Sequence, residues 1–216
     1  MAITVLLSDD HTIVREGLRL LLEAQKDIVV VGEAADGRET VRLVKQLHPD
    51  VVIMDIAMPE FNGIAATQRI KDSTPSVNVI ILSMYASNEH IFRALRAGAS
   101  GYLLKESAGR EVVDAVRAVA AGQRCLSGQL TGAVIDYIGK FGNGAPKSPL
   151  ESLSDRECEV LQFVVEGKSN AEIANTLSLS VKTVETYKSR LMNKLEIKDI
   201  PSLVKFAITH GLTPLK

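Results

Sequence analysis

Four ionisable side chains stand where short apolar runs stop, at the expected carboxyl ends of buried strands. They are Asp9, Asp10, Asp55 and Lys105. In a parallel sheet, ligands bind beyond the carboxyl ends of the strands, so the four groups are expected to meet in one pocket. Three carboxylates can hold a hard cation such as Mg²⁺, and an ammonium group can neutralise the remaining charge. The set is suited to phosphoryl transfer, which depends mainly on positioning and charge stabilisation.

The apolar pattern predicts the elements that position these residues. Strand-like runs alternate five times with helical patterns, which favours an α/β fold with a doubly wound parallel sheet. The expected strands cover residues 3–8, 28–34, 51–55, 77–82 and 101–104, and the expected helices cover residues 12–25, 37–47, 62–73, 87–98 and 108–121.

Bulk composition narrows the class of protein. The 216 residues carry a formal net charge of -1, so any nucleic-acid surface must be local. The two cysteines, Cys125 and Cys158, have no metal-ligand spacing, which favours ordinary apolar packing in a reducing compartment. No stretch approaches the roughly 20 apolar residues of a membrane helix. We therefore expect a cytoplasmic protein of two domains.

Two other interpretations compete with that of a cation-binding pocket for phosphoryl transfer. Strand-end aspartates often only cap the following helix, and for Asp9 taken alone that is the better interpretation. An Mg²⁺-dependent phosphatase that works through an aspartyl phosphate would use a similar set. Those enzymes place two aspartates on one strand as Asp-x-Asp, whereas Asp9 and Asp10 are adjacent and Asp55 is distant. The spacing favours a pocket in which Asp55 accepts a phosphoryl group, Asp9 and Asp10 hold Mg²⁺, and Lys105 contacts a phosphoryl oxygen.

Several short motifs together resemble the receiver domain of bacterial two-component response regulators. They are Asp9-Asp10, Asp55-x-x-Met58-Pro59-x-x-Asn62-Gly63, Ser83 after an apolar run, and Gly98-Ala99-x-Gly101-Tyr102-x-x-Lys105. The resemblance covers nearly all of residues 1–121 and implies a flavodoxin-like, five-stranded parallel sheet. It also implies that the protein is a regulator and not an enzyme, with a sensor histidine kinase as partner.

The resemblance assigns roles to individual residues. Asp55 is the implied phosphoacceptor, and Asp9, Asp10, Asp55 and the main-chain carbonyl of Ala57 are the implied Mg²⁺ ligands. Lys105 completes the pocket, Ser83 is the hydroxyl that moves toward the phosphoryl group, and Tyr102 is the switch aromatic. Exposed residues of the first helix, such as Thr12, Ile13 and Arg15, are expected to select the kinase.

Two positions near the pocket vary in the family and affect phosphoryl lifetime. Ala57 has no side chain to orient an attacking water, and Tyr85 can shield the site. We expect slower self-dephosphorylation than in relatives with polar residues at these positions.

The C-terminal part of the chain follows a different pattern. Residues 123–149 form an expected linker with one helical segment around Leu130–Ile138, and a Gly, Pro and Ser cluster closes it. The pattern after residue 150 is all helical, with a capping box at Ser154–Glu157. Two helical patterns, at residues 170–177 and 181–195, are joined closely enough for a helix-turn-helix.

The second helix of this pair carries the local basic surface. Residues 180–198 hold five basic residues and two acidic ones. Val184, Tyr187, Leu191 and Leu195 fall on the side expected to pack inward. The opposite side combines charge with short hydrogen-bonding groups, as a major-groove reader would. The alternatives are an ordinary solvated face and a module that binds protein.

The segment from Leu153 to Leu195 resembles the LuxR-type DNA-binding domain of the NarL/FixJ regulators. Matching motifs are Leu153-Ser154-x-Arg156-Glu157, Gly167-Lys168-Ser169-Asn170, and Leu179-Ser180-x-x-Thr183-Val184-x-x-Tyr187. The resemblance implies a four-helix domain over residues 150–216, a receiver over residues 1–122, and double-stranded promoter DNA as the partner. The implied phosphate contacts are Lys182, Thr183, Lys188, Arg190 and Asn193, and the implied base contacts are Glu185, Thr186 and Ser189.

Two points stay open at this level. Glu185 departs from the basic or neutral residue often found at its position, so the preferred DNA site is undefined. Phosphorylation in this family either releases the DNA-binding helices or promotes a homodimer. Plausible dimer or docking faces are the segment around Leu130–Ile138 and the last helix, with Leu203, Val204, Ala207 and Ile208.

Overall fold

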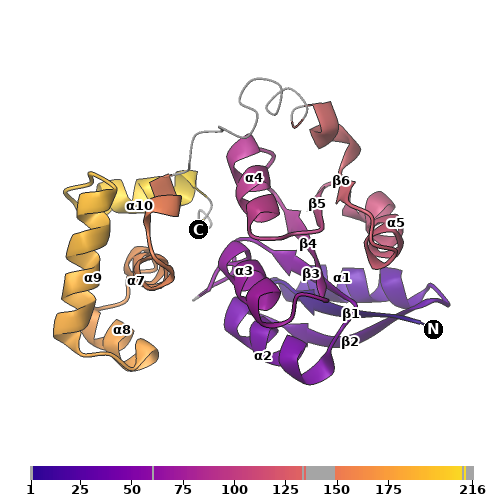
Figure 1. Ribbon diagram of the computed structural model, residues 1–216, viewed down its shortest axis with the longest axis horizontal. Coiled ribbons are helices and arrows are strands. Elements are labelled where there is room, and N and C mark those ends of the chain that lie inside the picture. The colour runs from indigo at the N-terminus through magenta and orange to yellow at the C-terminus, as the bar shows by residue number, and fades with distance from the viewer. Residues whose placement is uncertain (1, 60, 133, 135–148, 211, 213–216) are drawn as a thin grey trace. The chain divides into compact units, whose positions relative to one another are not determined.

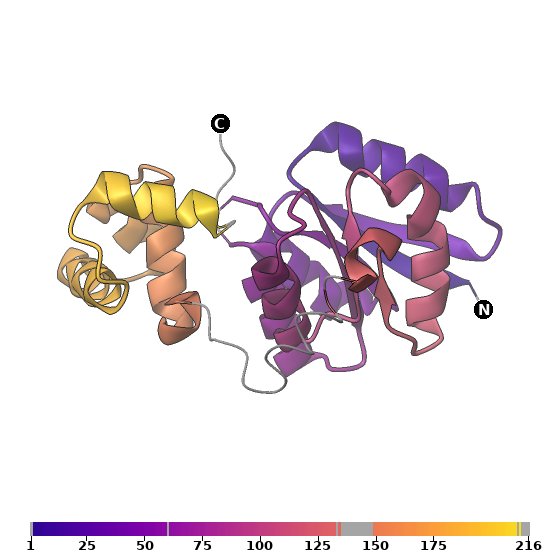
Figure 2. The same ribbon diagram turned by 90° about the horizontal axis from the view of Figure 1, so that it is seen from above.

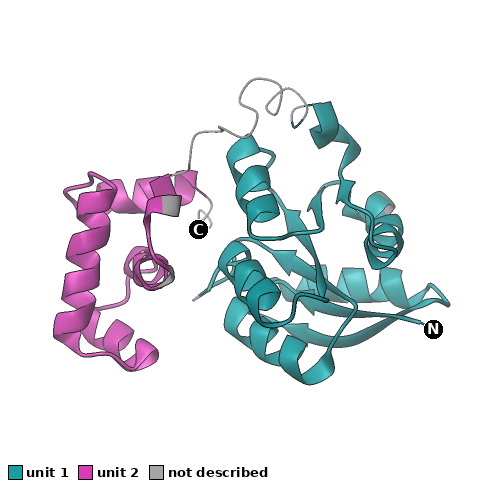
Figure 3. Ribbon diagram, in the orientation of Figure 1, with its two compact units in different colours: residues 1–143 teal, residues 144–216 magenta. Residues whose placement is uncertain are grey.

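The computed structural model describes residues 2–59, 61–132, 134, 149–210 and 212. The chain divides into two compact units, residues 1–143 and 144–216 (Figure 3). Each has a hydrophobic core of its own. Among the described residues, no helix is long and apolar enough to cross a membrane.

Unit 1 is a parallel α/β sandwich (Figure 1). Its strands run in the order β2-β1-β3-β4-β5-β6, and the first five have the flavodoxin-like order. The strands are β1 (Ile3–Ser8), β2 (Ile28–Ala34), β3 (Val51–Asp55), β4 (Asn78–Ser83), β5 (Gly101–Leu104) and β6 (Cys125–Leu126). The helices are α1 (Thr12–Glu23), α2 (Gly37–Leu47), α3 (Gly63–Ser73), α4 (Asn88–Arg96) and α5 (Ala108–Ala120).

Helices cover both faces of the sheet, as the continuous apolar strands require. Residues of α1 and α5 share one buried cluster with one face of the strands, and residues of α2, α3 and α4 share the other cluster (Figure 2). All five residues of β3 are buried. The prediction of a doubly wound parallel sheet is confirmed.

The sheet has one strand more than the five that we predicted. β6 is only two residues long and pairs in parallel with β5, with Gly101 beside Cys125 and Tyr102 beside Leu126. A two-residue strand is too short for an apolar alternation to show, so the sequence pattern gave no signal. β6 and the helical residues 128–132 and 134 were expected in the linker, yet they lie within the first compact unit. The remainder of the segment around Leu130–Ile138 lies outside the described residues.

Unit 2 is all helical, as predicted. A 3₁₀ helix (Pro149–Ser152) precedes α7 (Asp155–Val165), α8 (Asn170–Leu177), α9 (Val181–Lys194) and α10 (Ile200–Thr209). The hydroxyls of Ser154, Ser169 and Ser180 cap α7, α8 and α9, and Asp199 caps α10. Ser178 adopts a left-handed conformation between α8 and α9, with φ of 54°. The expected linker residues 135–148 and Lys216 lie outside the described residues.

Gly63 allows the loop after β3 to lie against the strand end. Its N–H donates to the Ile56 carbonyl, and a Cβ at this position would lie 1.8 Å from the Asp55 carbonyl oxygen. Asn62 begins α3 by accepting from the Ala65 N–H. The sequence Asn62-Gly63 therefore holds α3 close to Asp55.

Replacing Gly63 with Ala should lower the free energy of unfolding of unit 1 by about 3 kcal/mol or more, because backbone atoms must move to remove the overlap. Denaturant unfolding of the full chain measures this change. Gly17→Ala is the matched control: a Cβ there meets nothing within 4 Å, and we expect a gain of up to about 1 kcal/mol within α1. Equal stability of the two variants would contradict the prediction.

Candidate functional site

Lys105 joins two of the predicted carboxylates at the carboxyl ends of the strands. Its ammonium nitrogen lies 2.7 Å from Asp9 Oδ2 and 2.9 Å from Asp55 Oδ2. Asp9 and Asp55 are buried, and the Lys105 side chain is 13% exposed. Asp55 Oδ1 also accepts from the Ile56 N–H at 2.8 Å. Residues that are far apart in the chain thus form one buried charge cluster.

The electrostatics of this cluster favour an additional positive charge. Burial raises the pKa of Asp55, and the nearby Asp9 carboxylate acts in the same direction, while Lys105 opposes them. Burial disfavours the charged form of Lys105, but the two carboxylates outweigh it and raise the pKa of the ammonium group. One ammonium group is shared by two buried carboxylates, with a third carboxylate close by.

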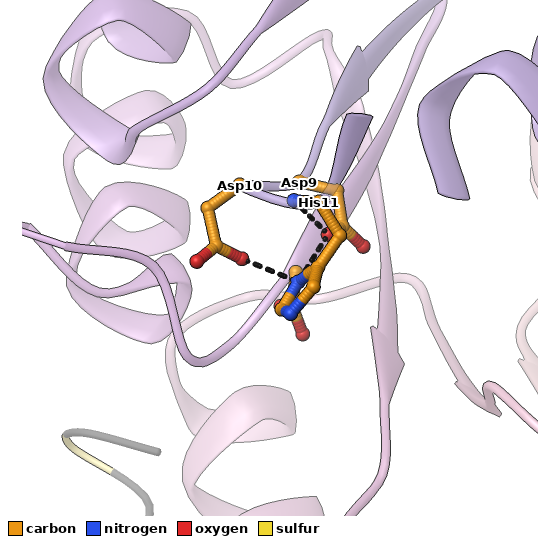
Figure 4. Close-up of side chains that lie close together, drawn as sticks. Asp9, Asp10 and His11 are labelled. Carbon is orange, nitrogen blue, oxygen red and sulfur yellow. Dashed lines mark hydrogen bonds and ion pairs between the residues drawn. The ribbon is translucent and has the colours of Figure 1, made fainter. Parts of the chain in front are cut away.

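Asp10 and His11 extend the cluster toward solvent (Figure 4). His11 Nδ1 lies 2.8 Å from Asp10 Oδ1 and 3.2 Å from Asp9 Oδ1. Donor atoms from Asp9, Asp10, His11 and Asp55 all lie within 4.8 Å of one another. These distances fit a metal site with mainly oxygen ligands. Ala57 lies two residues beyond the end of β3.

Ser83 and Tyr102 form the second half of the pocket. Ser83 ends β4 fully buried, and its hydroxyl accepts from the Tyr85 N–H at 3.1 Å. The Tyr102 ring is also fully buried, and its hydroxyl donates to the Tyr85 carbonyl at 2.7 Å. Burial raises the pKa of Tyr102, and a hydrogen bond with Ser83 offsets part of this effect. The aromatic ring therefore lies inside the protein, with its hydroxyl held at the backbone of Tyr85.

Tyr85 packs beside this pocket. Its ring stacks on His90, with ring centroids 4.6 Å apart and an interplanar angle of 10°. Burial and the Asp55 carboxylate raise the pKa of its hydroxyl, while Lys105 opposes them. The slow self-dephosphorylation expected from Ala57 and Tyr85 stays a prediction.

Arg15 is part of the support for the pocket, a role that the sequence did not suggest. One guanidinium nitrogen donates to the Asp9 carbonyl at 2.6 Å, and Nε lies 3.0 Å from Glu33 Oε2. The Arg15 side chain is 13% exposed, whereas Ile13 is 79% exposed. Ile13 is thus accessible to a partner, while Arg15 is held within the protein.

The predicted DNA-reading residues lie along α9. Val184 and Leu191 are buried in the helical core, and Tyr187 and Leu195 pack against it, as predicted. Of the eight predicted phosphate and base contacts, six are exposed, and two, Thr183 and Lys188, are half-buried. The exposed ones are Lys182, Glu185, Thr186, Ser189, Arg190 and Asn193. Glu185, Lys188, Ser189 and Asn193 line one groove.

Comparison with known proteins agrees with both units. The family model described as the response regulator receiver domain matches residues 5–117, and that of the bacterial regulatory proteins of the luxR family matches residues 151–207. The transcriptional regulatory protein LiaR of Bacillus subtilis is 42% identical over 210 residues, which span 97% of this chain and 99% of that protein. This chain belongs to the two-component response regulators of the NarL/FixJ family. It is a transcriptional regulator with a receiver domain and a LuxR-type DNA-binding domain.

Other relatives share this organisation. The oxygen regulatory protein NreC of Staphylococcus carnosus is 39% identical, over 96% of this chain and 98% of that protein. Among solved structures, the RcsB response regulator of Salmonella typhimurium is 29% identical with a TM-score of 0.59, over 96% of this chain and 99% of that one. An RcsB–DNA complex matches with 28% identity and a TM-score of 0.59, over 95% of this chain and 98% of that one.

One basic residue of α9 in this response regulator has a structural partner. Lys194 Nζ lies 2.7 Å from Glu157 Oε2 and donates to the Ser152 carbonyl at 3.0 Å. Glu157 is buried, and it also accepts from the Ser154 N–H at 2.8 Å in the capping box of α7. The sequence predicted the capping box, but it gave no sign that a basic residue of α9 completes it.

The same contacts predict how stability depends on pH. Burial opposes ionisation of Glu157, but the hydrogen bonds from Lys194 and Ser154 outweigh it and hold the pKa of the carboxyl below its ordinary value of 4.5. A lowered pKa stabilises the folded state above the ordinary value, and this contribution is lost as the pH falls through the folded-state pKa. Replacing Glu157 with Gln removes the ion pair with Lys194 and should lower the free energy of unfolding by about 1–3 kcal/mol at neutral pH. Because Lys194 is partly exposed, solvent weakens the ion pair and the loss should be smaller than for a fully buried pair.

Calorimetric unfolding of the full chain, from neutral pH to below 4.5, measures this effect on the transition of the helical unit. The wild type should lose stability on acidification more steeply than Glu157→Gln. Glu196→Gln, at an exposed position, is the control and should follow the wild type. Parallel curves for the wild type and Glu157→Gln would contradict the assignment.

Proposed function

We propose that a sensor histidine kinase switches this response regulator by phosphorylating Asp55. The observation that carries the proposal is the pair of Lys105 contacts, to Asp9 and to Asp55, in a buried pocket. A phosphoryl group on Asp55 adds negative charge to a site that already contains an ammonium group. Lys105 then moves from an ion pair with the free carboxylate to a contact with a phosphoryl oxygen.

We further propose that Mg²⁺ is the cofactor of this step. Carboxylate oxygens of Asp9, Asp10 and Asp55 supply suitable ligands, and the main-chain carbonyl of Ala57 is the fourth proposed ligand. The ion would neutralise charge on the transferring group. The residues of the chain orient the reaction: Lys105 and the Ile56 N–H hold the Asp55 carboxylate from two sides.

Ser83 and Tyr102 are the proposed switch residues. For the Ser83 hydroxyl to turn toward a phosphoryl oxygen on Asp55, it must release the Tyr85 N–H that it now accepts. Tyr102 holds the carbonyl of the same residue. The backbone at Tyr85 therefore connects the two side chains, and a change at one is expected to reach the other.

The proposed readout is sequence-specific binding of α9 to promoter DNA. Lys182, Lys188 and Arg190 supply positive charge for phosphates, and Glu185 and Ser189 present a carboxylate and a hydroxyl to base edges. The hydroxyl of Thr186 bonds to the Lys182 carbonyl, and that of Thr183 pairs with Ser180, so both are held at the start of the helix. All the phosphate and base contacts that the sequence predicted on α9 are kept in this proposal.

The RcsB structures include a complex with DNA and dimers bound to DNA. We propose that this response regulator likewise acts on DNA as a homodimer once it is phosphorylated. Because its partner is promoter DNA, we place its action in the cytoplasm. A protein-binding role for the helical unit is the alternative, and sequence-specific retardation of DNA fragments separates the two.

We propose no catalytic turnover of external substrates. The matched relatives are transcriptional regulators. Repeated hydrolysis of a small phosphomonoester by the full chain would restore the phosphatase interpretation.

Replacing Asp55 with Asn should abolish acyl phosphate formation, because the amide cannot act as the phosphoryl acceptor. Incubation with acetyl phosphate and Mg²⁺, followed by intact-mass measurement, gives the result directly. The adduct on the wild type should be labile in acid and in base, and chelation of Mg²⁺ should prevent its formation. Asp27→Asn, an exposed carboxylate paired with Arg117, is the control and should keep the adduct. An unchanged adduct on Asp55→Asn would remove Asp55 from its proposed role.

Replacing Lys188 with Ala should weaken DNA binding about equally across sequences and reduce the slope of log affinity against log salt by about one unit. A fluorescence titration at several salt concentrations measures the slope. Lys205→Ala removes the same charge from an exposed position on α10 and should leave the slope unchanged. If both variants give the wild-type slope, Lys188 makes no phosphate contact.

A further inference from the structure

The segment after α5 is built into the receiver at the edge where Tyr102 lies. Two backbone hydrogen bonds attach it to β5 and to the residue before it: the Cys125 N–H donates to the Ser100 carbonyl, and the Ser127 N–H donates to the Tyr102 carbonyl. A third bond runs from the Leu104 N–H to the Ser127 hydroxyl. Gly101 permits this close approach, since a Cβ there would lie 3.2 Å from the Cys125 carbonyl oxygen. Residues that lead toward the second unit are thus fixed to the strand that carries the switch aromatic.

Ser127 is the centre of a buried polar cluster. It has no exposed surface, and its hydroxyl donates to Glu111 Oε2 of α5. The Ser127 hydroxyl oxygen also lies 2.8 Å from the hydroxyl oxygen of Ser107, a residue that is also buried. Ser107 contacts Glu111 as well, at 3.1 Å, and the Leu104 carbonyl at 3.2 Å. One hydroxyl therefore connects β5, the start of α5 and the segment after β6.

Two routes lead from the phosphorylation pocket to Ser127, one to its backbone N–H and one to its hydroxyl. The first is the backbone of β5, because Tyr102 contacts Tyr85 through its side chain and Ser127 through its carbonyl. The second begins at Lys105. The residue before it, Leu104, donates its N–H to the Ser127 hydroxyl, and Ser107, two residues after it, contacts the same oxygen. A change at either Tyr102 or Lys105 thus bears directly on Ser127.

The helical residues that follow have an apolar anchor in the receiver core. Leu130 is 3% exposed and Val134 is 6% exposed, and both belong to the buried cluster that contains Tyr102 and Leu104. The Leu130 N–H donates to the Ser127 carbonyl at 2.8 Å, which begins this helical turn at the serine. Because a densely packed core allows only discrete side-chain arrangements, movement of the buried Tyr102 ring would require Leu130 and Val134 to move as well.

We propose that residues 125–132 and 134 form a coupling element, in which Ser127 passes the state of Tyr102 and Lys105 to the chain that leads to the DNA-binding unit. Ser127 is a positioning residue and takes no part in phosphoryl transfer. The inference rests on the proposed function, because it needs phosphorylation of Asp55 to alter DNA binding. The inference assigns the coupling to a specific residue, Ser127, which contacts neither the phosphoryl site nor DNA.

Two variants of the full chain test the coupling. Ser127→Ala removes the hydroxyl from the polar cluster, and Leu130→Ala weakens the apolar anchor while leaving the cluster intact. For each, we measure adduct formation on Asp55 with acetyl phosphate and Mg²⁺. We then measure affinity, with and without acetyl phosphate, for a duplex selected from a random pool by the phosphorylated wild type. Adduct formation in each variant should stay within about twofold of the wild type. The ratio of DNA affinities with and without phosphorylation should fall to about one, so that phosphorylation no longer strengthens DNA binding.

Hydrogen exchange gives a readout that does not depend on DNA. In Ser127→Ala, the backbone N–H of Leu104 loses its acceptor and should exchange about tenfold faster, which corresponds to about 1.4 kcal/mol of opening free energy. Ser100→Ala is the matched control. It removes a half-buried hydroxyl at the same sheet edge that bonds to Asn78 and not to the cluster. This variant should keep the wild-type gain in DNA affinity.

The outcomes separate this inference from the proposed function. A wild-type protein that forms no adduct, or that binds DNA equally with and without it, overturns the proposed function. A wild-type gain that Ser127→Ala and Leu130→Ala retain in full overturns the coupling element alone. Loss of the gain in Ser100→Ala to the same degree would also overturn it, since the effect would then belong to the sheet edge in general. Should Ser127→Ala fail to fold, Leu130→Ala decides.

Discussion

The structure of the receiver depends on one charge balance, the Lys105 ammonium group held between the carboxylates of Asp9 and Asp55. Burying two carboxylates is costly unless a cation compensates them. The parallel sheet brings the three groups together because Asp55 ends β3, while Asp9 and Lys105 directly follow β1 and β5. The same burial leaves Asp55 imperfectly compensated, with a raised pKa, so the pocket favours an added metal ion. The same lysine thus compensates the buried charge of Asp9 and contacts Asp55, the proposed phosphoacceptor.

The elements around this balance restrict where a change can travel. Gly63 and Asn62 hold α3 against the end of β3, and Arg15 holds the backbone at Asp9 from the other side. Toward β5, the backbone of Tyr85 connects Ser83 and Tyr102. Its N–H donates to the Ser83 hydroxyl and its carbonyl accepts from the Tyr102 hydroxyl, and rotation of either side chain would break its bond. Backbone contacts thus hold the pocket on the side of α1 and α3, whereas hydrogen bonds of the Ser83 and Tyr102 side chains connect it to β4 and β5.

The sequence predicted most of the fold because the apolar runs are long and their periods are clear. The five long strands were found within one residue of their observed bounds, and Ser154 and Ser180 were recognised as the caps of α7 and α9. The failures have physical causes. β6 has two residues and forms through Gly101, and the partners of Arg15, Ser127 and Lys194 are set by tertiary packing. The roles of Ser83 and Tyr102 came from a family resemblance, since neither residue alone differs from an ordinary buried one.

The short strand β6 also has a consequence for the solubility of the receiver. Unpaired strand edges act as templates for association between chains, and β5 would present such an edge if β6 were absent. A fragment ending at residue 122, where the sequence alone places the end of the domain, would remove this cover and expose the apolar surface under Leu130 and Val134. Self-association of such a fragment would therefore reflect a missing strand, and it would say little about the homodimer that we propose on DNA.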